Sequence, residues 1–422
     1  MTLRLYRPYK IMLVIYAVFL AAAFIISTPS EILAGLRLIM ITVDVLITDY
    51  AEVGGFGAML VNSVIVSLFS MAMLLRYNVK PDGTILMALW MNCGFALFGK
   101  NPVNMWPLTL GVYLYAKAKK EPFVDHIPSA LLSATLSPVV SSIGFLNLFH
   151  PAIDIFLGIC LGTAAGFILP AVTAFTFRIH SGYNLYNAGF AGGLISTFLV
   201  SLMKSVGIDI PTAMIWSSGN NVKAACLLYI TAAVLLISGF FSDQKKNTPA
   251  NIKVIMKQSG RLISDFYIEY KNSVFVNMGI LCLFSTTISL LLGFDLNGPT
   301  MGGILTITGF GCLGKHLRNI TPVFLGAVLS TYVNMWDLAA PHNSLSILFS
   351  AGLAPIAGQF GWAWGILAGF LHVNLSIHIG YLNNGLNLYN NGYAAGFVAM
   401  VLIPLTSAFG KKKGENQSFH PM

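Results

Sequence analysis

Two matching segments carry polar side chains suited to binding a small solute. The residues N-L-Y-N-A-G-F-A-G-G occupy 184–193, and N-L-Y-N-N-G-Y-A-A-G occupy 387–396. Both lie in apolar surroundings, where an unpaired amide is costly, so these groups must face protein, water or solute. We predict that they line a polar cavity and bind a solute through Asn184, Tyr186, Asn187, Asn387, Tyr389 and Asn390. The alternative is that they cap helices and bond to neighbouring backbone, while Gly and Ala permit close helix packing.

A second pair of segments supplies cationic groups. G-K-N-P-V-N at 99–104 and G-K-H-L-R-N at 314–319 each join two short apolar runs. We expect Lys100 and Lys315 to attract an anionic group. We expect Asn104 and Asn319 to form hydrogen bonds with the same group. The alternative is that each lysine extends its ammonium to the membrane interface and that Gly-Lys-Asn is ordinary turn chemistry. The short runs also suggest hairpins that dip part-way into a membrane.

The sequence contains no motif typical of an enzyme active site. It contains no H-E-x-x-H, no phosphate-binding Gly-Lys-Ser loop, no G-x-S-x-G and no Cys/His cluster at metal-ligand spacing. We therefore expect no enzyme activity, no catalytic residues, no metal and no cofactor.

Acidic and sulfur-containing residues also suggest structural rather than chemical roles. No carboxylate stands out as a buried ion-coupling group, because the candidates fall at the ends of apolar runs: Asp82, Asp154, Asp295 and Asp337. The five cysteines lie inside apolar runs without a C-x-x-C pair, which predicts small core residues: Cys93, Cys160, Cys226, Cys282 and Cys312.

The composition indicates that lipid is the main solvent of this chain. Of 422 residues, 56% are hydrophobic and 9% are charged, whereas soluble domains carry roughly 25% charged residues. Such a low charge content excludes an ordinary soluble enzyme and a disordered chain. We predict an all-α polytopic membrane protein whose surroundings are a lipid bilayer.

Fourteen apolar runs give the expected membrane segments, with lengths typical of helices that span or enter a bilayer. They are 11–27, 57–75, 84–99, 104–118, 129–147, 151–175, 183–205, 220–241, 273–293, 299–314, 320–336, 344–358, 361–378 and 390–408. The runs at 129–147 and 344–358 are rich in Ser, Gly and Pro, which favours re-entrant or broken helices. The stretch 28–56 has the mixed character of an interfacial helix, and a further span there stays open.

The basic residues set the expected orientation. With the N-terminus inside, most Lys and Arg residues fall on cytoplasmic loops, and the four outside are Arg37, Lys100, Lys204 and Lys223. This bias satisfies the positive-inside rule and explains the net charge of +9 without a nucleic-acid partner. We predict a multi-pass protein of the cell membrane with cytoplasmic N- and C-termini.

An internal repeat organises the sequence. One constant offset brings Asn62 onto Asn277 and also aligns Gly99-Lys100 with Gly314-Lys315. A slightly smaller offset aligns the two N-L-Y-N segments. We predict a first repeat at 1–210 and a second at 211–422, with 244–272 as a cytoplasmic connecting segment. Seven runs per half is an odd number, so the second copy is expected to be inverted relative to the first, with the solute site between them.

A resemblance to known families is carried by the residues G-Y-N-L-Y-N-A-G-F-A-G-G. There the chain resembles an uncharacterised family of bacterial multi-pass membrane proteins, domain of unknown function 1576. The resemblance covers nearly the whole chain and implies a membrane location but no activity. A weaker resemblance is to urea-transporter-like channels, which are also inverted repeats. The chain departs from them in having seven runs per half and a second Asn-Tyr-Asn element.

The sequence as a whole predicts transport of a small polar or anionic solute by alternating access. The alternatives are a passive urea-transporter-like channel and a membrane-embedded scaffold or lipid-active enzyme. The expected partners are a small-molecule solute and the bilayer, with no nucleic acid, and a homo-oligomer stays open.

Overall fold

The chain folds almost entirely into helices, as its apolar composition predicts. The computed structural model describes residues 5–44, 46–210, 212–241, 247–262 and 264–409. Within this part the two strands that pair with each other are short: β1 (Ile47–Thr48) runs parallel to β2 (Met214–Ile215). The fold is therefore that of a helical membrane protein.

Helices of the first half follow the predicted apolar runs. They are α1 (Arg7–Ile26), α2 (Pro29–Ile41), α3 (Tyr50–Gly54), α4 (Phe56–Arg76), α5 (Gly83–Phe95), α6 (Pro102–Lys119), η1 (Phe123–His126), α7 (Ile127–Ser133), η2 (Ala134–Leu136), α8 (Ser137–Gly144), α9 (Pro151–His180) and α10 (Asn187–Ser205). The stretch 28–56, predicted to be an interfacial helix, is divided among α2, β1 and α3.

Helices of the second half recur in the same order. They are α11 (Asn221–Phe240), α12 (Thr248–Ile255), α13 (Phe266–Tyr270), α14 (Ser273–Leu291), α15 (Gly298–Gly309), η3 (Phe310–Cys312), α16 (Leu317–Val333), α17 (Pro341–Ser350), η4 (Ala351–Leu353), α18 (Ala354–Phe360), α19 (Trp362–Ile379), η5 (Gly380–Leu382) and α20 (Asn390–Phe409). Each main helix from α4 to α10 thus has a partner between α14 and α20. The boundary at 210/211 stays a prediction.

Nine helical segments in the described residues are long and apolar enough to cross a bilayer. They are Arg7–Ile26, Phe56–Arg76, Phe123–Gly144, Pro151–His180, Asn187–Ser205, Asn221–Phe240, Ser273–Leu291, Trp362–Leu382 and Asn390–Phe409. The predicted count of fourteen is not confirmed. Helices α5 and α15 have 13 and 12 residues, so each extends about 20 Å, short of a hydrocarbon core of about 30 Å.

The broken helices expected from the Ser-, Gly- and Pro-rich runs are present in both halves. The 3-10 turn η2 separates α7 from α8, and η4 separates α17 from α18. Pro138 and Pro355 lie at the start of α8 and α18, where a missing backbone N–H does no harm. Each break leaves backbone carbonyls free to bind other parts of the chain.

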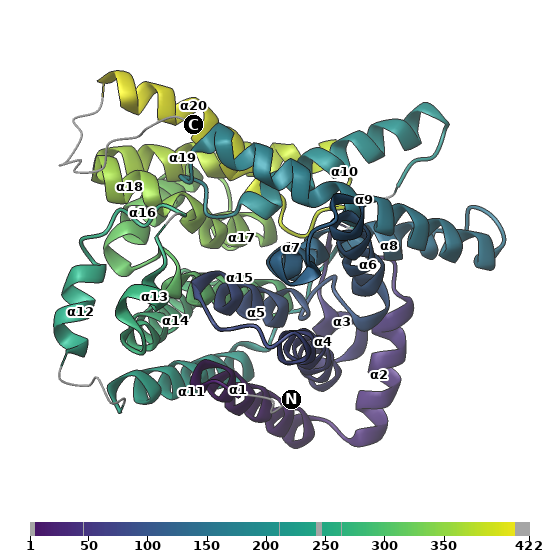
Figure 1. Ribbon diagram of the computed structural model, residues 1–422, viewed down its shortest axis with the longest axis horizontal. Coiled ribbons are helices and arrows are strands. Elements are labelled where there is room, and N and C mark those ends of the chain that lie inside the picture. Colours follow the sequence, from purple (N-terminus) through teal and green to yellow (C-terminus); the bar gives the residue numbers. More distant parts are fainter. Residues whose placement is uncertain (1–4, 45, 211, 242–246, 263, 410–422) are drawn as a thin grey trace.

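Helices α5 and α15 pack against each other in the middle of the molecule (Figure 1). A Cβ added to Gly94, at the end of α5, would lie 2.9 Å from the carbonyl oxygen of Gly302, near the start of α15. A Cβ on Gly309, at the end of α15, would lie 2.5 Å from Cβ of Trp90. The end of each helix thus meets an earlier part of the other, so the two matching helices run antiparallel.

Each half fixes the start of the other half's short central helix. The Asp49 carboxylate accepts a hydrogen bond from the backbone N–H of Gly298 at 3.1 Å. The Asp265 carboxylate accepts one from the N–H of Gly83 at 2.7 Å. Carboxylates at helix N-termini satisfy free N–H groups and complement the helix dipole. The two halves are therefore held together by exchanged caps.

The cysteines divide into two groups. Cys93, Cys282 and Cys312 are buried, as predicted for small core residues, whereas Cys160 and Cys226 are exposed. The prediction was wrong for these two because the outer face of a membrane helix is as apolar as the core, so hydrophobicity alone does not separate them. All five are free thiols.

A matched pair of asparagines closes the turn after each central helix. Asn62 Nδ2 donates to the carbonyl oxygens of Ala96 at 2.7 Å and Lys100 at 2.9 Å. Asn277 Nδ2 donates to those of Gly311 and Lys315, each at 2.7 Å. The offset that aligns Asn62 with Asn277 also aligns both of their acceptors, so the structure repeats at the level of single hydrogen bonds.

We expect Asn62→Ala and Asn277→Ala each to lower the free energy of unfolding by about 1–3 kcal/mol, because each leaves two buried carbonyls without their donor. Unfolding of the purified protein in detergent, followed by circular dichroism, measures this. Asn247→Ala is the control, since Asn247 is exposed and makes no capping hydrogen bond. A neutral effect at either buried asparagine would contradict the equivalence.

Candidate functional site

The two N-L-Y-N segments follow matching left-handed turns. Ser181 and Gly182 have φ of 50° and 80°, and Asn384 and Gly385 have φ of 45° and 77°. These turns end one helix and allow the chain to enter the next, α10 or α20, from inside the protein. Their irregular backbone lies among membrane helices, so it needs hydrogen-bond partners from the protein.

Asparagine side chains link each of these segments to the opposite half by hydrogen bonds. Asn184 Nδ2 donates to the Gly392 carbonyl at 3.1 Å, and Asn387 Nδ2 donates to the Gly189 carbonyl at 2.9 Å. Both asparagines are buried. The pair is reciprocal, because each amide binds the helix that follows the other N-L-Y-N segment.

Backbone hydrogen bonds between the halves run alongside these amides. The N–H of Leu185 donates to the Gly352 carbonyl in η4, and the N–H of Leu388 donates to the Thr135 carbonyl in η2, both at 2.9 Å. The carbonyls freed by the two broken helices are thus the acceptors that the N-L-Y-N segments require. This explains why each half contains both irregular features.

Tyr186 and Tyr389 meet at the junction of the two halves. Their ring centroids are 4.5 Å apart, and both side chains are buried. Phe310 packs edge-on against Tyr186, and Phe95 packs edge-on against Tyr389, at 5.2 and 5.0 Å. Phe349 contacts both tyrosines. An aromatic cluster with rings from both halves therefore forms the centre of the candidate site.

Lys315 directs its ammonium into this cluster. The Nζ atom donates a hydrogen bond to Tyr186 Oη and lies 4.2 Å from the Tyr186 ring centroid and 4.8 Å from that of Phe310. These contacts are cation–π in kind, and burial strengthens them. The Tyr389 hydroxyl lies against Tyr186 without a hydrogen bond of normal geometry in the described residues.

Lys100 occupies the matching position but has a different partner. Its Nζ atom donates to Asn92 Oδ1. The residue that matches Asn92 in the second half is Ile307, which offers no hydrogen-bond acceptor. The two lysines are therefore equivalent in backbone position and different in side-chain environment.

Neither lysine extends to the protein surface. Lys100 is 1% exposed and Lys315 is 0% exposed, so the alternative in which they extend to the interface is wrong. The turns that carry them follow short central helices and lie inside the protein, which brings the ammonium groups inward. Among the described residues, ion pairs involve other side chains, and no carboxylate lies within 4.0 Å of either ammonium.

Asn104 and Asn319 shape the lysine-bearing turns. Asn104 Oδ1 accepts from the N–H of Asn101, and Asn319 Oδ1 accepts from the N–H of His316, at 2.9 and 3.0 Å. Their Nδ2 atoms donate to the carbonyls of Gly99 and Gly314, at 3.2 and 2.9 Å. Both therefore act on the turn backbone in this structure, and solute binding by them stays a prediction.

Asn187 makes its contacts within its own half. Its Oδ1 accepts from Thr176 at 2.7 Å and lies 2.8 Å from His180 Nε2, and its Nδ2 donates to the Thr173 carbonyl at 2.9 Å. Since the N–H groups of two loop residues donate to His180 Nδ1, Nε2 carries the ring proton and donates to Asn187.

Asn390 likewise makes a local contact, accepting from Asn383 Nδ2 at 2.8 Å. Of the ten predicted residues, Lys315, Tyr186 and Tyr389 converge on one point, and Asn184 and Asn387 flank it.

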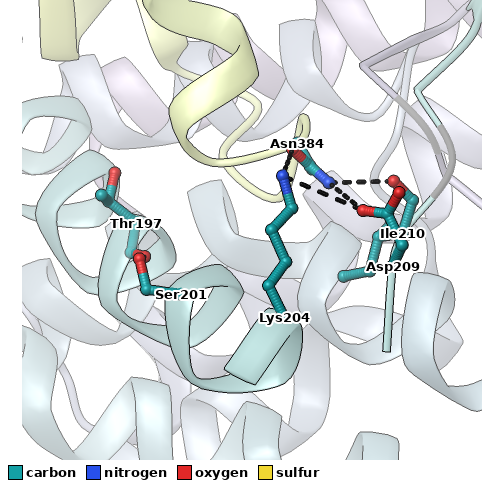
Figure 2. A network of polar contacts seen from close by, with 6 residues as sticks. All are labelled: Thr197, Ser201, Lys204, Asp209, Ile210 and Asn384. Carbon is teal, nitrogen blue, oxygen red and sulfur yellow. Dashed lines mark hydrogen bonds and ion pairs between the residues drawn. The ribbon is translucent and has the colours of Figure 1, made fainter. Parts of the chain in front are cut away.

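A polar network holds the turn that precedes the second N-L-Y-N segment (Figure 2). Lys204 Nζ donates to Asn384 Oδ1 at 3.4 Å and lies 3.9 Å from Asp209 Oδ1. Asn384 Nδ2 donates to the Ile210 carbonyl at 2.9 Å. The network ties the segment after α10 to the turn before α20, and so to the opposite half.

Buried carboxylates are the feature that the sequence prediction missed. Asp44 and Asp154 are each 1% exposed and Asp49 is 0% exposed, so carboxylates are buried inside the protein, while the expectation that none of them couples an ion stays a prediction. Asp44 and Asp49 fall in the stretch predicted to be interfacial, which here folds back into the protein. A carboxylate within an apolar stretch was the available signal.

The structure also records a hollow of about 520 Å³ at the surface. It lies between α2, α3 and α4, with Glu31 and Lys223 among its lining residues, and none of the ten predicted residues lines it. Among the described residues no group of three or more His, Cys, Asp and Glu side chains is placed to hold a metal ion.

Comparison with known proteins gives a family without an assigned activity. The model of the family described as "Protein of unknown function (DUF1576)" matches residues 28–205 and 244–408. No curated protein and no solved structure matches. The resemblance to urea-transporter-like channels therefore stays a prediction.

We expect Lys315→Met to raise the free energy of unfolding by about 1 kcal/mol or more. The substitution removes a buried ammonium whose desolvation costs several kcal/mol, and it gives up cation–π contacts worth about 2 kcal/mol. Thermal unfolding in detergent without added anions measures the change, with the exposed Lys253→Met as control. A loss of stability would show that Lys315 serves the fold rather than a ligand.

Proposed function

We propose that this chain, which belongs to the DUF1576 family of proteins of unknown function, is a membrane transporter that moves a small polar or anionic solute by alternating access. The solute site lies between the two halves, at the cluster of Tyr186, Tyr389 and Lys315, with Lys100 at the matching position. The family match supplies no activity, so the proposal is supported by the geometry of the centre.

The observation that carries the proposal is the burial of two ammonium groups without a carboxylate. In the described part of the chain, Lys100 and Lys315 bond only to neutral side-chain oxygens. A buried charge is tolerated when an opposite charge and hydrogen bonds compensate for lost hydration. A small anion supplies that compensation and favours the ammonium form, whereas burial without one lowers the pKa of both lysines and favours the neutral amine.

Matching positions of the two lysines support an inverted repeat. The hydrogen bonds of Asn62 and Asn277 correspond one by one. The matching helices α5 and α15 run antiparallel, which is the arrangement expected when a twofold axis lies in the membrane plane. Transporters with this design bind solute near the midplane, where discontinuous helices meet.

Movement between the halves gives a route to each side of the membrane. The N-L-Y-N segments are joined across the centre by four reciprocal hydrogen bonds, donated by Asn184, Leu185, Asn387 and Leu388. With all four formed, the aromatic centre is closed. We propose that loss of two of them on one side opens that side while the other pair keeps the opposite side shut.

Uptake into liposomes tests this function directly. Purified full-length protein is reconstituted, and a panel of labelled probes is offered: acetate, inorganic phosphate, sulfate and glutamate as anions, and urea as a neutral solute. We expect saturable uptake of at least one anion, lowered at least about tenfold in Lys100→Met plus Lys315→Met, because each charge-assisted contact contributes about 1.5 kcal/mol or more.

Lys253→Met is the matched control for this experiment, since its side chain is exposed on α12. Flux that does not saturate would replace the carrier with a channel. Uptake that is unchanged in the double variant would remove the lysines from the site. No uptake of any probe by folded protein would favour a scaffold or a lipid-active enzyme.

A further inference from the structure

Asp44 is a buried carboxylate at a junction of three helices. Its Oδ1 accepts a hydrogen bond from Tyr50 Oη at 3.1 Å. Its Oδ2 accepts from Asn104 Nδ2 at 2.9 Å and from Ser141 Oγ. Its backbone carbonyl accepts from Ser142 Oγ. One residue thus links the segment after α2 to α3, α6 and α8.

The groups around this carboxylate are all neutral. In the described part of the chain no Lys, Arg or His lies within 4.0 Å of Asp44. The amide N–H of Asn104 points directly at Oδ2, and a metal cation bound at that oxygen would be repelled by the same hydrogen atom. A proton is therefore the ligand that fits, because it needs one lone pair and no shell of oxygen atoms.

Ser141 can accept a hydrogen bond from that proton. Its hydroxyl also lies 3.5 Å from the Ser137 carbonyl, one helical turn earlier in α8. When a proton adds to Oδ2, the Ser141 hydrogen turns to Ser137, and Ser141 Oγ then accepts the hydrogen bond from the new carboxyl O–H. The network therefore accommodates both the carboxylate and the carboxylic acid without an unsatisfied group.

The second half manages the same junction without a carboxylate. Asp49 and Asp265 cap the central helices from equivalent positions in the two halves, and the offset that aligns them also matches Asp44 with Gly260. A Cβ on Gly260 would lie 2.7 Å from Asn319 Nδ2, the atom that matches the Asn104 donor. Ser141 matches Gly358 when the two broken helices are aligned.

The glycines at the matching positions of the second half show that the fold does not require a carboxylate at this junction. Gly260 and Gly358 allow close backbone contacts, to the Gly314 and Ser259 carbonyls respectively. Neither an acid nor its serine partner is needed to hold the junction closed. The first half carries both, and a paired departure from the repeat that buries an ionisable group points to function.

The junction is connected to both parts of the candidate solute site. Asn104 Nδ2, which binds Asp44, also donates to the carbonyl of Gly99, next to Lys100. Helix α8, which carries Ser141, begins directly after η2, where the Thr135 carbonyl accepts from Leu388 and Thr135 Oγ1 donates to Asn387 at 3.0 Å. A change at Asp44 thus acts on the lysine turn and on one N-L-Y-N segment.

We propose that Asp44 is a proton-binding site and that its protonation controls the Lys100 turn and the second N-L-Y-N segment, which makes transport proton-coupled. This inference rests on the proposed function for the coupling, and the proton site itself does not depend on it.

Titration of Asp44 falls in an accessible range. Asp44 lies outside the nine apolar spans, and burial raises its pKa to about 6, with the hydrogen bonds from Ser141, Tyr50 and Asn104 opposing the rise. Tyr50 is the titratable group that α3 places against it. The groups that face Asp44 from α6 and α8 are Asn104, Ser141 and Ser142, which do not titrate. The charged residue nearest along the Asn104-bonded turn is Lys100, next to Gly99.

Infrared difference spectroscopy of the full-length protein tests the proton site without any solute. Lowering the pH through 6 is expected to produce the C=O stretch of a buried protonated carboxyl group. The band should disappear in Asp44→Asn and remain in Asp154→Asn, a second buried carboxylate whose hydrogen bonds come from the backbone N–H of Phe149.

Ser141→Gly copies the residue of the second half and keeps the carboxyl group in place if Asp44→Asn does not fold. Loss of its hydrogen bond to the carboxylate is expected to move the midpoint of the band upward by about one pH unit. A band that persists in Asp44→Asn, or a midpoint unmoved in Ser141→Gly, overturns the proton site.

Coupling is read separately in the liposome assay. A proton gradient directed into the liposomes, with the more acidic side outside, should increase uptake of the transported anion probe several-fold in the native protein. The same gradient should leave uptake by Asp44→Asn unchanged. Uptake that depends on the lysines but ignores the gradient would reject the coupling and keep the transporter. A titrating band with no uptake of any probe would reject the transporter and keep the proton site.

Discussion

Irregular backbone inside a membrane protein must find its hydrogen bonds within the protein, because lipid tails offer none. This constraint organises the whole molecule. The N-L-Y-N segments and the broken helices η2 and η4 each leave backbone groups free, and the two sets satisfy each other across the centre. Asn184 and Asn387 add side-chain bonds along the same path. Neither half has its hydrogen bonds complete without the other.

Lys100 and Lys315 are buried by this mutual arrangement without a counter-charge in the described residues. The side chains of Asn62 and Asn277 donate hydrogen bonds to the carbonyls of Lys100 and Lys315, which holds both turns in place and keeps the ammonium groups inside at a cost in stability. Proteins keep such strained groups where function requires them. The anionic solute that we propose would account for both the burial and the repetition, and Asp44 adds an ionisable group in one half alone.

The sequence predicted the helical membrane class and the pairing of equivalent polar motifs, because Asn, Lys and Gly stand out against an apolar background. It also predicted the broken helices, since Ser, Gly and Pro cluster there. It could not place Lys100 and Lys315, because a lysine after a short apolar run is compatible with an interfacial turn or a buried one. Asp44 was missed for a related reason. Its stretch reads as interfacial until tertiary contacts with α6 and α8 are known.

The orientation of the two halves is the claim on which the proposed mechanism depends most directly. Lys120 and Met335 lie at equivalent positions after the matching helices α6 and α16, with φ of 59° and 53°. Both are exposed. Single cysteines at these positions, with Cys160 and Cys226 replaced by Ala, are labelled in intact cells by a membrane-impermeant maleimide. The inverted repeat predicts labelling of position 335 from outside and of position 120 only after the membrane is opened. Labelling of both from the same side would contradict it.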